Sequence, residues 1–375
     1  MGTGGITKRV SALADGRDLI YFDDADTALS AERSVDLRTL DQRPETATMR
    51  QDVLTGEWIS IAAARQNRVF LPPAELDPLA PQSENNPSEI PSNYDVAVFE
   101  NKSPSFGPDL VGADAPRSLD DLAAIGIDRT RTSVGRCEVV CFSPAHAGSF
   151  GSISRSRART VIEAWADRTA ALSAMPGVEQ VFPFENRGEA IGVTLHHPHG
   201  QIYGYPYVTP RTSTLIRSID SYGPRLFHDV LDAERAGDRM IISGEHWSAF
   251  VPFAARWPLE VHMLPHRQVP DFAATNDDER SELAALYLRL LRGVDAIYET
   301  PTPYIAAWHQ APVSTHRDDI RLMLQLTSPR RAADKLKYLA GSEAAMGAWI
   351  GDVPPETQAS LIRDGVARAD EENPV

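Results

Sequence analysis

Five consecutive residues near the middle of the chain carry groups that could do chemistry together: His197, Pro198, His199, Gly200 and Gln201. Because a residue that precedes proline disfavours the helical region, Pro198 biases this segment toward an extended conformation. Side chains alternate along an extended segment, so the two imidazoles and the amide of Gln201 should share one face. Gly200 would allow a ligand or another stretch of backbone to come close.

A row of imidazoles with an amide suits the transfer of a phosphoryl or nucleotidyl group. Imidazole has an ordinary pKa of about 6.5, so its neutral form can attack phosphorus near neutral pH. The attack forms a P–N intermediate and divides one difficult displacement into two easier ones. The amide of Gln201 could donate a hydrogen bond to a phosphoryl oxygen as charge shifts. Two other interpretations of the row are a strand edge with satisfied surface histidines and half of a metal site.

Strand and helix patterns around the row predict the elements that position it. Alternating or β-branched runs predict strands in the first half at 57–62, 94–99, 138–142, 178–184 and 192–203. Apolar spacing predicts a helix at 156–175, and a polar, proline-rich stretch predicts a long ordered loop at 71–93. The second half repeats this order, with a helix at 277–298 and strands at 247–251, 259–264, 304–308 and 321–326. A final helix is expected within 352–375.

Strands, one long helix and further strands in each half predict an α+β fold, as opposed to a run of βαβ units. We expect two half-barrel units with mostly antiparallel sheets and helices packed outside. The expected domains are a polar, loosely packed N-terminal extension over 1–45, an N-terminal unit over 46–210 that contains the histidine row, and a C-terminal unit over 211–375.

The charge balance of the chain argues against two classes of partner. The sequence has 37 Lys and Arg against 52 Asp and Glu, a net charge of −15. General binding to nucleic acid or to an anionic membrane is therefore not expected. An acidic protein that handles phosphates must instead concentrate its cations locally.

The sequence also predicts a compartment. No stretch approaches the roughly 18 apolar residues of a membrane span, and the N-terminus lacks the apolar run of a signal peptide. Cys137 and Cys141 are too few for a disulfide framework. We expect both thiols to be reduced and buried, and the protein to be cytoplasmic.

The sequence GVTLHHPHGQIYGYPYV at 192–208 resembles the active-site signature of the galactose-1-phosphate uridylyltransferase family, in the histidine-triad superfamily. Further similarities, in the same order along the chain, lie at 52–58, 65–68, 98–101, 141–146, 184–188, 244–247, 257–260, 308–312 and 337–343. The resemblance extends over about residues 50–364. It implies that both half-barrel units are histidine-triad-like.

The resemblance implies a reaction. UMP would pass from UDP-glucose to galactose 1-phosphate by a ping-pong route through a uridylyl-histidine intermediate, as in the Leloir pathway of galactose metabolism. His199 corresponds to the nucleophile, and the backbone carbonyl of His197 would orient its ring. Gln201 corresponds to the amide that contacts the transferred phosphoryl group.

The resemblance also implies residues that bind the substrates. Arg65 and Arg68 match a pair of phosphate-binding arginines, which would supply local positive charge, and Thr194 replaces a serine that touches phosphate. Asn101 matches a uridine or ribose contact, and the positions of Asn186 and Gly192 line the nucleotide site. In the family, a C-terminal segment from the partner subunit of a homodimer reaches the sugar and phosphates. Lys337, Tyr338 and Glu343 match that segment.

The pattern departs from the family at its zinc site. Many members hold zinc with a Cys-x-x-Cys pair and two histidines, but Asp77 and Ala80 stand at the cysteine positions. His146 and His197 occupy the histidine positions. Asp77, the two histidines and a water could still hold zinc, or hydrogen bonds could replace the metal.

A second, iron-type site of some members is also incomplete. It uses a glutamate and three histidines, of which only His309 remains, because Met323 and Gln325 stand at the other two histidine positions and no acidic residue is evident near Leu215. We therefore expect no iron, and no metal is required for the chemistry proposed at His199.

Other functions remain possible at this point. One is a related nucleotidyltransferase or phosphorylase that acts on ADP-sugars or dinucleoside polyphosphates. Another is a non-catalytic sensor of nucleotide sugars, and a third is a metal-dependent hydrolase. The complete row from His199 to Gln201 argues against the sensor, and the incomplete metal positions argue against the hydrolase.

Overall fold

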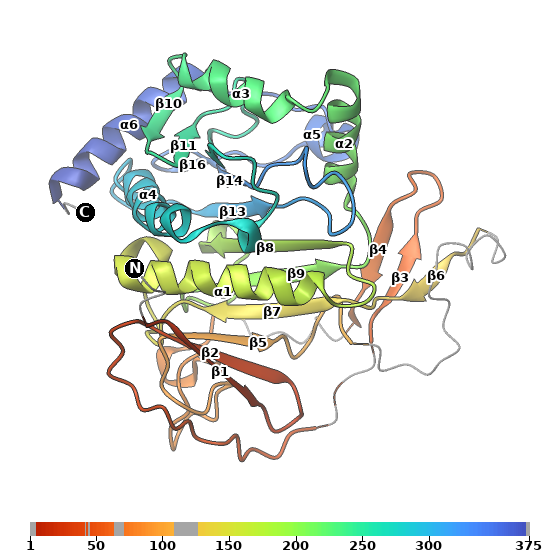
Figure 1. The fold of residues 1–375 in the computed structure, drawn as a ribbon, viewed down its shortest axis with the longest axis vertical. Coiled ribbons are helices and arrows are strands. Elements are labelled where there is room, and N and C mark those ends of the chain that lie inside the picture. The colour runs from red at the N-terminus through yellow and green to blue at the C-terminus, as the bar shows by residue number, and fades with distance from the viewer. Residues whose placement is uncertain (1–4, 42, 44–45, 64–70, 109–126, 373–375) are drawn as a thin grey trace.

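The computed structural model describes residues 5–41, 43, 46–63, 71–108 and 127–372. A single antiparallel sheet of eleven strands runs the length of the molecule (Figure 1). The first six strands in spatial order are β1 (Thr7–Ala12), β2 (Asp18–Asp23), β5 (Val96–Glu100), β7 (Arg136–Cys141), β9 (His199–Tyr205) and β8 (Gln180–Arg187). The other five are β13 (Tyr304–His309), β14 (Met323–Ser328), β12 (Leu259–Pro265), β11 (Trp247–Phe250) and β10 (Met240–Ser243).

The order of elements in the first half is repeated in the second. β5, β7, helix α1 (Arg155–Ser173), β8 and β9 correspond to β11, β12, helix α4 (Asp277–Asp295), β13 and β14. The two half-sheets join where β8 pairs with β13 at the centre of the sheet. The α+β prediction with mostly antiparallel sheets is thus confirmed, and the two half-sheets form one open sheet.

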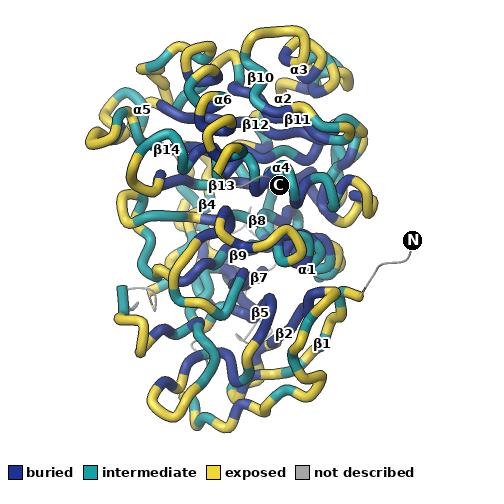
Figure 2. The backbone as a smooth tube through the Cα atoms, turned by 90° about the vertical axis from the view of Figure 1, so that its left-hand side faces the viewer, coloured by how far each residue is buried: buried dark blue, intermediate teal, exposed yellow. Residues whose placement is uncertain are grey.

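The helices α1 and α4 lie on the same face of the sheet, as the turned view shows (Figure 2). The helix α6 (Pro355–Glu372) packs on α4 and on the edge strand β10. Smaller elements complete the described part of the chain: α2 (Pro210–Tyr222), α3 (Leu226–Arg235), α5 (Gly341–Met346), a sheet of β4 (Trp58–Ile61), β3 (Thr48–Gln51) and β6 (Thr130–Thr132), and a hairpin of β15 (Arg330–Ala332) and β16 (Lys335–Leu336). Among the described helices, none is long and apolar enough to span a bilayer.

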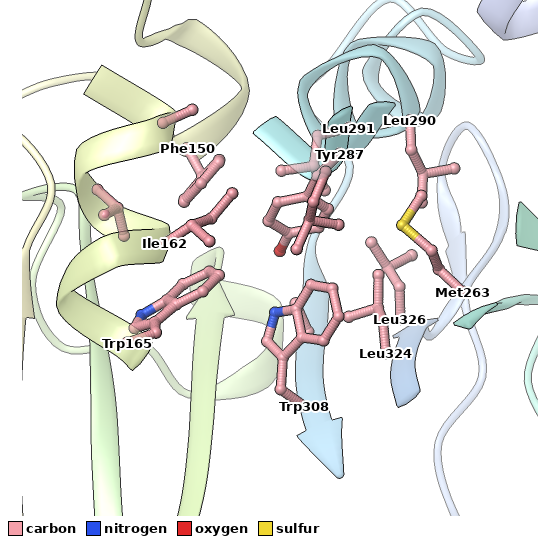
Figure 3. Packing of buried hydrophobic residues seen from close by; sticks show 14 of the residues in the cluster. Phe150, Ile162, Trp165, Met263, Tyr287, Leu290, Leu291, Trp308, Leu324 and Leu326 are labelled. Carbon is pink, nitrogen blue, oxygen red and sulfur yellow. The ribbon is translucent and has the colours of Figure 1, made fainter. Parts of the chain in front are cut away.

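Aromatic side chains from both halves meet beneath the two long helices (Figure 3). Trp165 of α1 lies 5.9 Å from Trp308 of β13, and Tyr287 of α4 lies 5.5 Å from Trp308, measured between ring centroids. Asn276 and Glu279 start α4 with a capping box, which satisfies the first free N–H groups of the helix. The two halves therefore share one hydrophobic core.

The prediction of a loosely packed N-terminal extension is wrong for residues 7–23. β1 and β2 form one edge of the main sheet, and β2 pairs with β5. Ile20 and Phe22 belong to the core beneath the helices, whereas Leu19 and Tyr21 belong to a second core on the opposite face. A strand that is buried on both faces has no alternation of polar and apolar residues, so the run carries no period of two.

The predicted strand at 192–203 is also corrected, because β9 begins only at His199. Gly192 ends a one-turn helix at 189–191 with a left-handed φ of 83°. This backbone conformation cannot continue into a strand, so the residues up to Pro198 form an irregular approach to β9. The cysteine prediction is confirmed, since Cys137 and Cys141 are both buried and free.

Candidate active site

One face of β9 is accessible and the other is in the core. His199, Gln201 and Tyr203 are half-buried, whereas the alternate residues Gly200 and Ile202 are buried. β9 lies between β7 and β8, with Gln201 opposite Val139 and Phe184. The neighbouring strands therefore hold the row rigidly, on the face away from α1.

The ring of His199 is oriented by its own strand. Its Nδ1 lies 2.7 Å from the carbonyl oxygen of His197. A carbonyl can only accept, so Nδ1 carries the hydrogen and the lone pair of the neutral ring is on Nε2. The resemblance implied this orientation, and the structure has it.

The amide of Gln201 is oriented by a residue that the sequence analysis missed. The hydroxyl of Tyr203 donates to Oε1 of Gln201 at 3.1 Å. With Oε1 as the acceptor, the NH₂ group of Gln201 is the end that can donate to a ligand. The spacing of two residues along the strand was a signal for this contact, because Tyr203 must share the face of Gln201.

Gly200 is required by the packing behind the row. A Cβ at this position would lie 2.9 Å from the ring carbon Cζ of Phe142 and 2.9 Å from the carbonyl oxygen of Phe184. The close approach predicted at Gly200 is thus made by a ring and a backbone. It allows β9 to lie tightly against the core.

The imidazole of His197 does not join the row, contrary to the sequence prediction. Its side chain is buried, with Nδ1 2.7 Å from Asp77 Oδ2 and Nε2 2.7 Å from the carbonyl oxygen of Ser143. His197 lies in the bend before β9, where strand alternation does not yet apply. It contributes its carbonyl to the site and its ring to the support behind it.

Asp77 is the centre of that support. The same Oδ2 also lies 2.8 Å from Nδ1 of His146, and the hydroxyl of Tyr94 lies 2.9 Å from Nε2 of His197. Burial alone would raise the pKa of Asp77, but hydrogen bonding and charge from His197, together with bonds from Leu79 N–H and His146, lower it to about 2. The carboxylate is therefore ionised at neutral pH.

Of the predicted nucleotide-binding residues, Asn186 lies next to the row, and Thr194 and Gly192 lie in the segment that leads to it. Asn186 on β8 is exposed. It lies two residues after Phe184, the strand partner of Gln201, so it lies opposite His199 on the same face of the sheet. Thr194 is half-buried, and its carbonyl oxygen accepts from Leu71 N–H at 2.8 Å, which ties down the approach to β9. A Cβ at Gly192 would meet nothing within 4 Å, so the positive φ alone explains the glycine.

Comparison with known proteins identifies the family. The family described as "Galactose-1-phosphate uridyl transferase, N-terminal domain" matches residues 38–209, and its C-terminal domain matches residues 212–335. A galactose-1-phosphate uridylyltransferase of Streptomyces lividans is 42% identical over 95% of this chain and 97% of that protein. The chain belongs to the galactose-1-phosphate uridylyltransferase family.

Two further similarities agree with this family. A galactose-1-phosphate uridylyltransferase of Thermotoga maritima is 31% identical over 84% of this chain and 98% of that protein. A solved uridylyltransferase structure superposes with a TM-score of 0.74 at 26% identity, and covers 86% of this chain and 99% of its own. The chain is accordingly assigned to the nucleotidyltransferase class of enzymes.

The zinc position of this family does not fit zinc as the side chains lie here. Tetrahedral ligands at about 2.0 Å from zinc are about 3.3 Å apart. The two histidine nitrogens lie 2.8 and 2.7 Å from Asp77 Oδ2, which are hydrogen-bond distances. Among the described residues, no group of three or more His, Cys, Asp or Glu side chains is arranged to hold a metal ion.

The family's C-terminal segment is bonded within its own half. Lys337 is buried and donates to the carbonyl oxygens of Arg256, at 3.1 Å, and of Ile350. Its Nζ also lies 3.6 Å from a carboxylate oxygen of Glu343. Lys337 and Glu343 are therefore brought together with each other.

The same segment approaches the loop that leads to His199. Lys337 and Tyr338 line a small cavity of about 170 Å³ together with Ala190 and Ile191. Of the remaining predicted positions, Asn101 directly follows β5, which is separated from β9 by β7. Its Oδ1 accepts a hydrogen bond from Ser103 N–H at 2.9 Å. The two predicted phosphate-binding residues, Arg65 and Arg68, lie outside the described residues.

Proposed function

We propose that the protein is a UDP-glucose:hexose-1-phosphate uridylyltransferase that moves UMP from UDP-glucose to galactose 1-phosphate in galactose metabolism. The hydrogen bond from His199 Nδ1 to the carbonyl oxygen of His197, at 2.7 Å, carries the proposal. It holds the ring with Nε2 as the nucleophile. Family membership supports the choice of substrates.

The first displacement forms the intermediate. The lone pair of His199 Nε2 attacks the α-phosphorus of UDP-glucose, and the bond to the bridging oxygen breaks with its electrons on glucose 1-phosphate. The ring becomes cationic as the P–N bond forms. The carbonyl of His197 accepts from Nδ1 and so stabilises this positive charge more strongly in the transition state than in the ground state.

The second displacement reverses these changes. A phosphate oxygen of galactose 1-phosphate attacks the phosphorus, the P–N bond breaks, and its electrons return to Nε2 of His199. The products are UDP-galactose and the neutral ring. In both steps the amide of Gln201 donates to a phosphoryl oxygen that gains charge. Each step conserves protons, so no external acid or base is needed.

Labelling tests the intermediate directly. Enzyme incubated with UDP-glucose that carries label in the α-phosphate, without acceptor, should acquire acid-labile, alkali-stable label on His199. Galactose 1-phosphate should release the label as UDP-galactose. His199→Asn should bind UDP-glucose but remain unlabelled. A wild-type enzyme that turns over without ever carrying label would rule out the double displacement.

A separate measurement tests which nucleotide base the enzyme prefers: kcat/KM for UDP-glucose should exceed kcat/KM for ADP-glucose.

We infer that the reaction needs no metal cofactor. The nucleophile, the hydrogen-bond donor and the orienting carbonyl are all protein groups, and Asp77 holds the two histidines of the zinc position through hydrogen bonds. Turnover should therefore survive exhaustive chelation. Activity that is lost on chelation and regained with zinc would contradict this inference.

We also infer a homodimer in the cytoplasm. Large apolar side chains are exposed along the C-terminal segment, with Tyr338 76% exposed, Met346 79% and Ile350 57%. Such a patch favours cover by a protein surface, and the family pattern suggests a second copy. Light scattering on the purified protein should give twice the mass of the chain, and Tyr338→Glu should lower it. The buried free thiols of Cys137 and Cys141 support the compartment.

A further inference from the structure

A second cavity opens in the C-terminal half, with a volume of about 520 Å³. Three of its lining residues are arginines, namely Arg211, Arg256 and Arg321, and no acidic residue is among those that line it in the described part of the chain. A concentration of guanidinium groups is unexpected in a protein with a net charge of −15. The electrostatic potential in the cavity is therefore positive, in contrast to the negative net charge of the protein.

Two of the three guanidinium groups have no protein partner among the residues that the structure describes. Arg321 is held by Gln268 Oε1 at 3.1 Å and by the carbonyl oxygen of Pro265 at 3.2 Å. The guanidinium groups of Arg211 and Arg256 make no hydrogen bond or ion pair with any described residue. They present their donors to the cavity, where an anion could accept them.

Arg211 and Arg256 are close enough for their positive charges to repel each other. Burial lowers the pKa of Arg211, and the positive charge of Arg256 lowers it further, against an opposing effect of Glu260. Glu260 is fully buried behind the cavity, where it accepts from Gln325 Nε2 at 2.6 Å and from Arg256 N–H at 2.6 Å. The carboxylate that acts on Arg211 is thus already hydrogen-bonded to other donors.

The ring of His309 also lines the cavity. Nε2 of His309 lies 3.2 Å from Oε1 of Gln325, which is an acceptor, so the ring donates this hydrogen bond. Threonine, serine and glutamine side chains supply further uncharged polar groups in the lining.

The cavity is separate from the His199 row. The rings of His309, Phe182 and Phe184 follow one another along the sheet, with centroids 5.8 and 5.1 Å apart, and Phe184 is the strand partner of Gln201. Met323, which lines the cavity, begins β14, the counterpart of β9 in the repeated order of elements. Each half thus has a polar site beside its corresponding strand.

We propose that this cavity is a second anion site, which binds a phosphate ester through Arg211 and Arg256. Two unpartnered guanidinium groups match the oxygens of one or two phosphoryl groups. The positive end of α2, where Arg211 lies, adds to the attraction. The volume accommodates a sugar or nucleoside phosphate, and Phe227, Ile320 and Trp349 supply apolar walls for the remainder of such a molecule.

Calorimetric titration of the full-length protein with inorganic pyrophosphate tests the proposal. The variant Arg211→Met/Arg256→Met should bind one equivalent fewer per chain, or at least tenfold more weakly at that site, than the wild type. Arg217→Met is the matched control, because Arg217 lies on the same helix and does not line the cavity. The control should bind pyrophosphate as the wild type does. Equal stoichiometry and affinity in all three proteins would overturn the proposal.

Two further measurements, thermal stability and labelling of His199, distinguish loss of the anion site from misfolding or loss of the transferase activity. Since Arg211 and Arg256 repel each other, the double variant without ligand should melt at the wild-type temperature or above. Pyrophosphate should raise the melting temperature of the wild type by more than that of the variant. The single variant Arg211→Met, at a side chain that solvent still reaches, gives the same comparison with little risk to folding. All variants should still acquire label on His199, so failure of this site is distinct from failure of the transferase.

Discussion

At the scale of single residues, the row depends on groups that position other groups. Tyr203 touches Gln201, and Gln201 is proposed to touch the substrate. Loss of the Tyr203 hydroxyl leaves the amide present but free to rotate, so the donor is misplaced for part of the time.

Removing that hydroxyl should reduce turnover selectively. We expect Tyr203→Phe to lower kcat about tenfold with little change in KM, and Gln201→Ala to lower kcat by about 100-fold or more. The double variant should be no worse than Gln201→Ala alone, because the hydroxyl acts through the amide. Steady-state kinetics of the three variants check this. Additive losses would mean that Tyr203 acts independently of Gln201.

The buried carboxyl of Glu185, on the core side of β8, should make the stability of the protein depend on pH. Burial raises the pKa of this carboxyl to about 7, although a hydrogen bond from Tyr304 at 3.0 Å opposes the shift. The folded protein keeps a proton that the unfolded chain releases above its ordinary value of about 4.5. Stability should therefore fall as pH rises from about 4.5 to 7, by roughly 3 kcal/mol, and stay low above that.

The Glu185→Gln variant isolates this effect, because its amide keeps the shape of the protonated acid. We expect the variant to be more stable than the wild type at pH 8, and the difference to shrink toward pH 5. Urea unfolding at the two pH values measures it. A difference that does not depend on pH would show that Glu185 does not titrate in this range.

At the scale of elements, β9 is positioned by how tightly it packs. Gly200→Ala should force β9 away from Phe142 and the carbonyl of Phe184, with a loss of about 1–3 kcal/mol in unfolding free energy and a displaced His199. Gly237→Ala is the control, since its Cβ would make only ordinary contacts, at 3.4 Å and 3.7 Å, away from the site. Chemical denaturation and the rate of uridylyl transfer should both separate the two variants. A stable, fully active Gly200→Ala would contradict the packing argument.

Elements with a strong local period could be predicted, and others could not. The helices α1 and α4 lie within a few residues of the predicted ranges, because their apolar spacing and the Asn276 cap are local signals. The helix α2 was missed, since only Thr212 and Ile219 are buried along it and it lacks a full apolar stripe. The hairpin of β1 and β2 was missed because its inner strand is buried on both faces.

At the scale of the whole molecule, the shared core predicts how the protein unfolds. Trp165, Tyr287 and Trp308 connect elements from both halves in one cluster. We therefore expect one calorimetric transition, with equal calorimetric and van't Hoff enthalpies. Trp308→Leu should lower the melting temperature of the whole molecule without splitting the transition, through a loss of a few kcal/mol. Two separable transitions would show that the halves are independent, and the predicted boundary between residues 210 and 211 would then mark two folding units.

The sequence by itself determined the chemistry that the chain can do. The order of motifs identified the family, and the spacing in the histidine row placed His199 and Gln201 on one strand face, because both are local properties of the chain. Tertiary structure decided which histidine does what, since Asp77, far away in sequence, binds the ring of His197 and leaves only its carbonyl to His199. It also brought Arg211 and Arg256 into one cavity. Such contacts depend on which distant segments meet, and no local pattern encodes that.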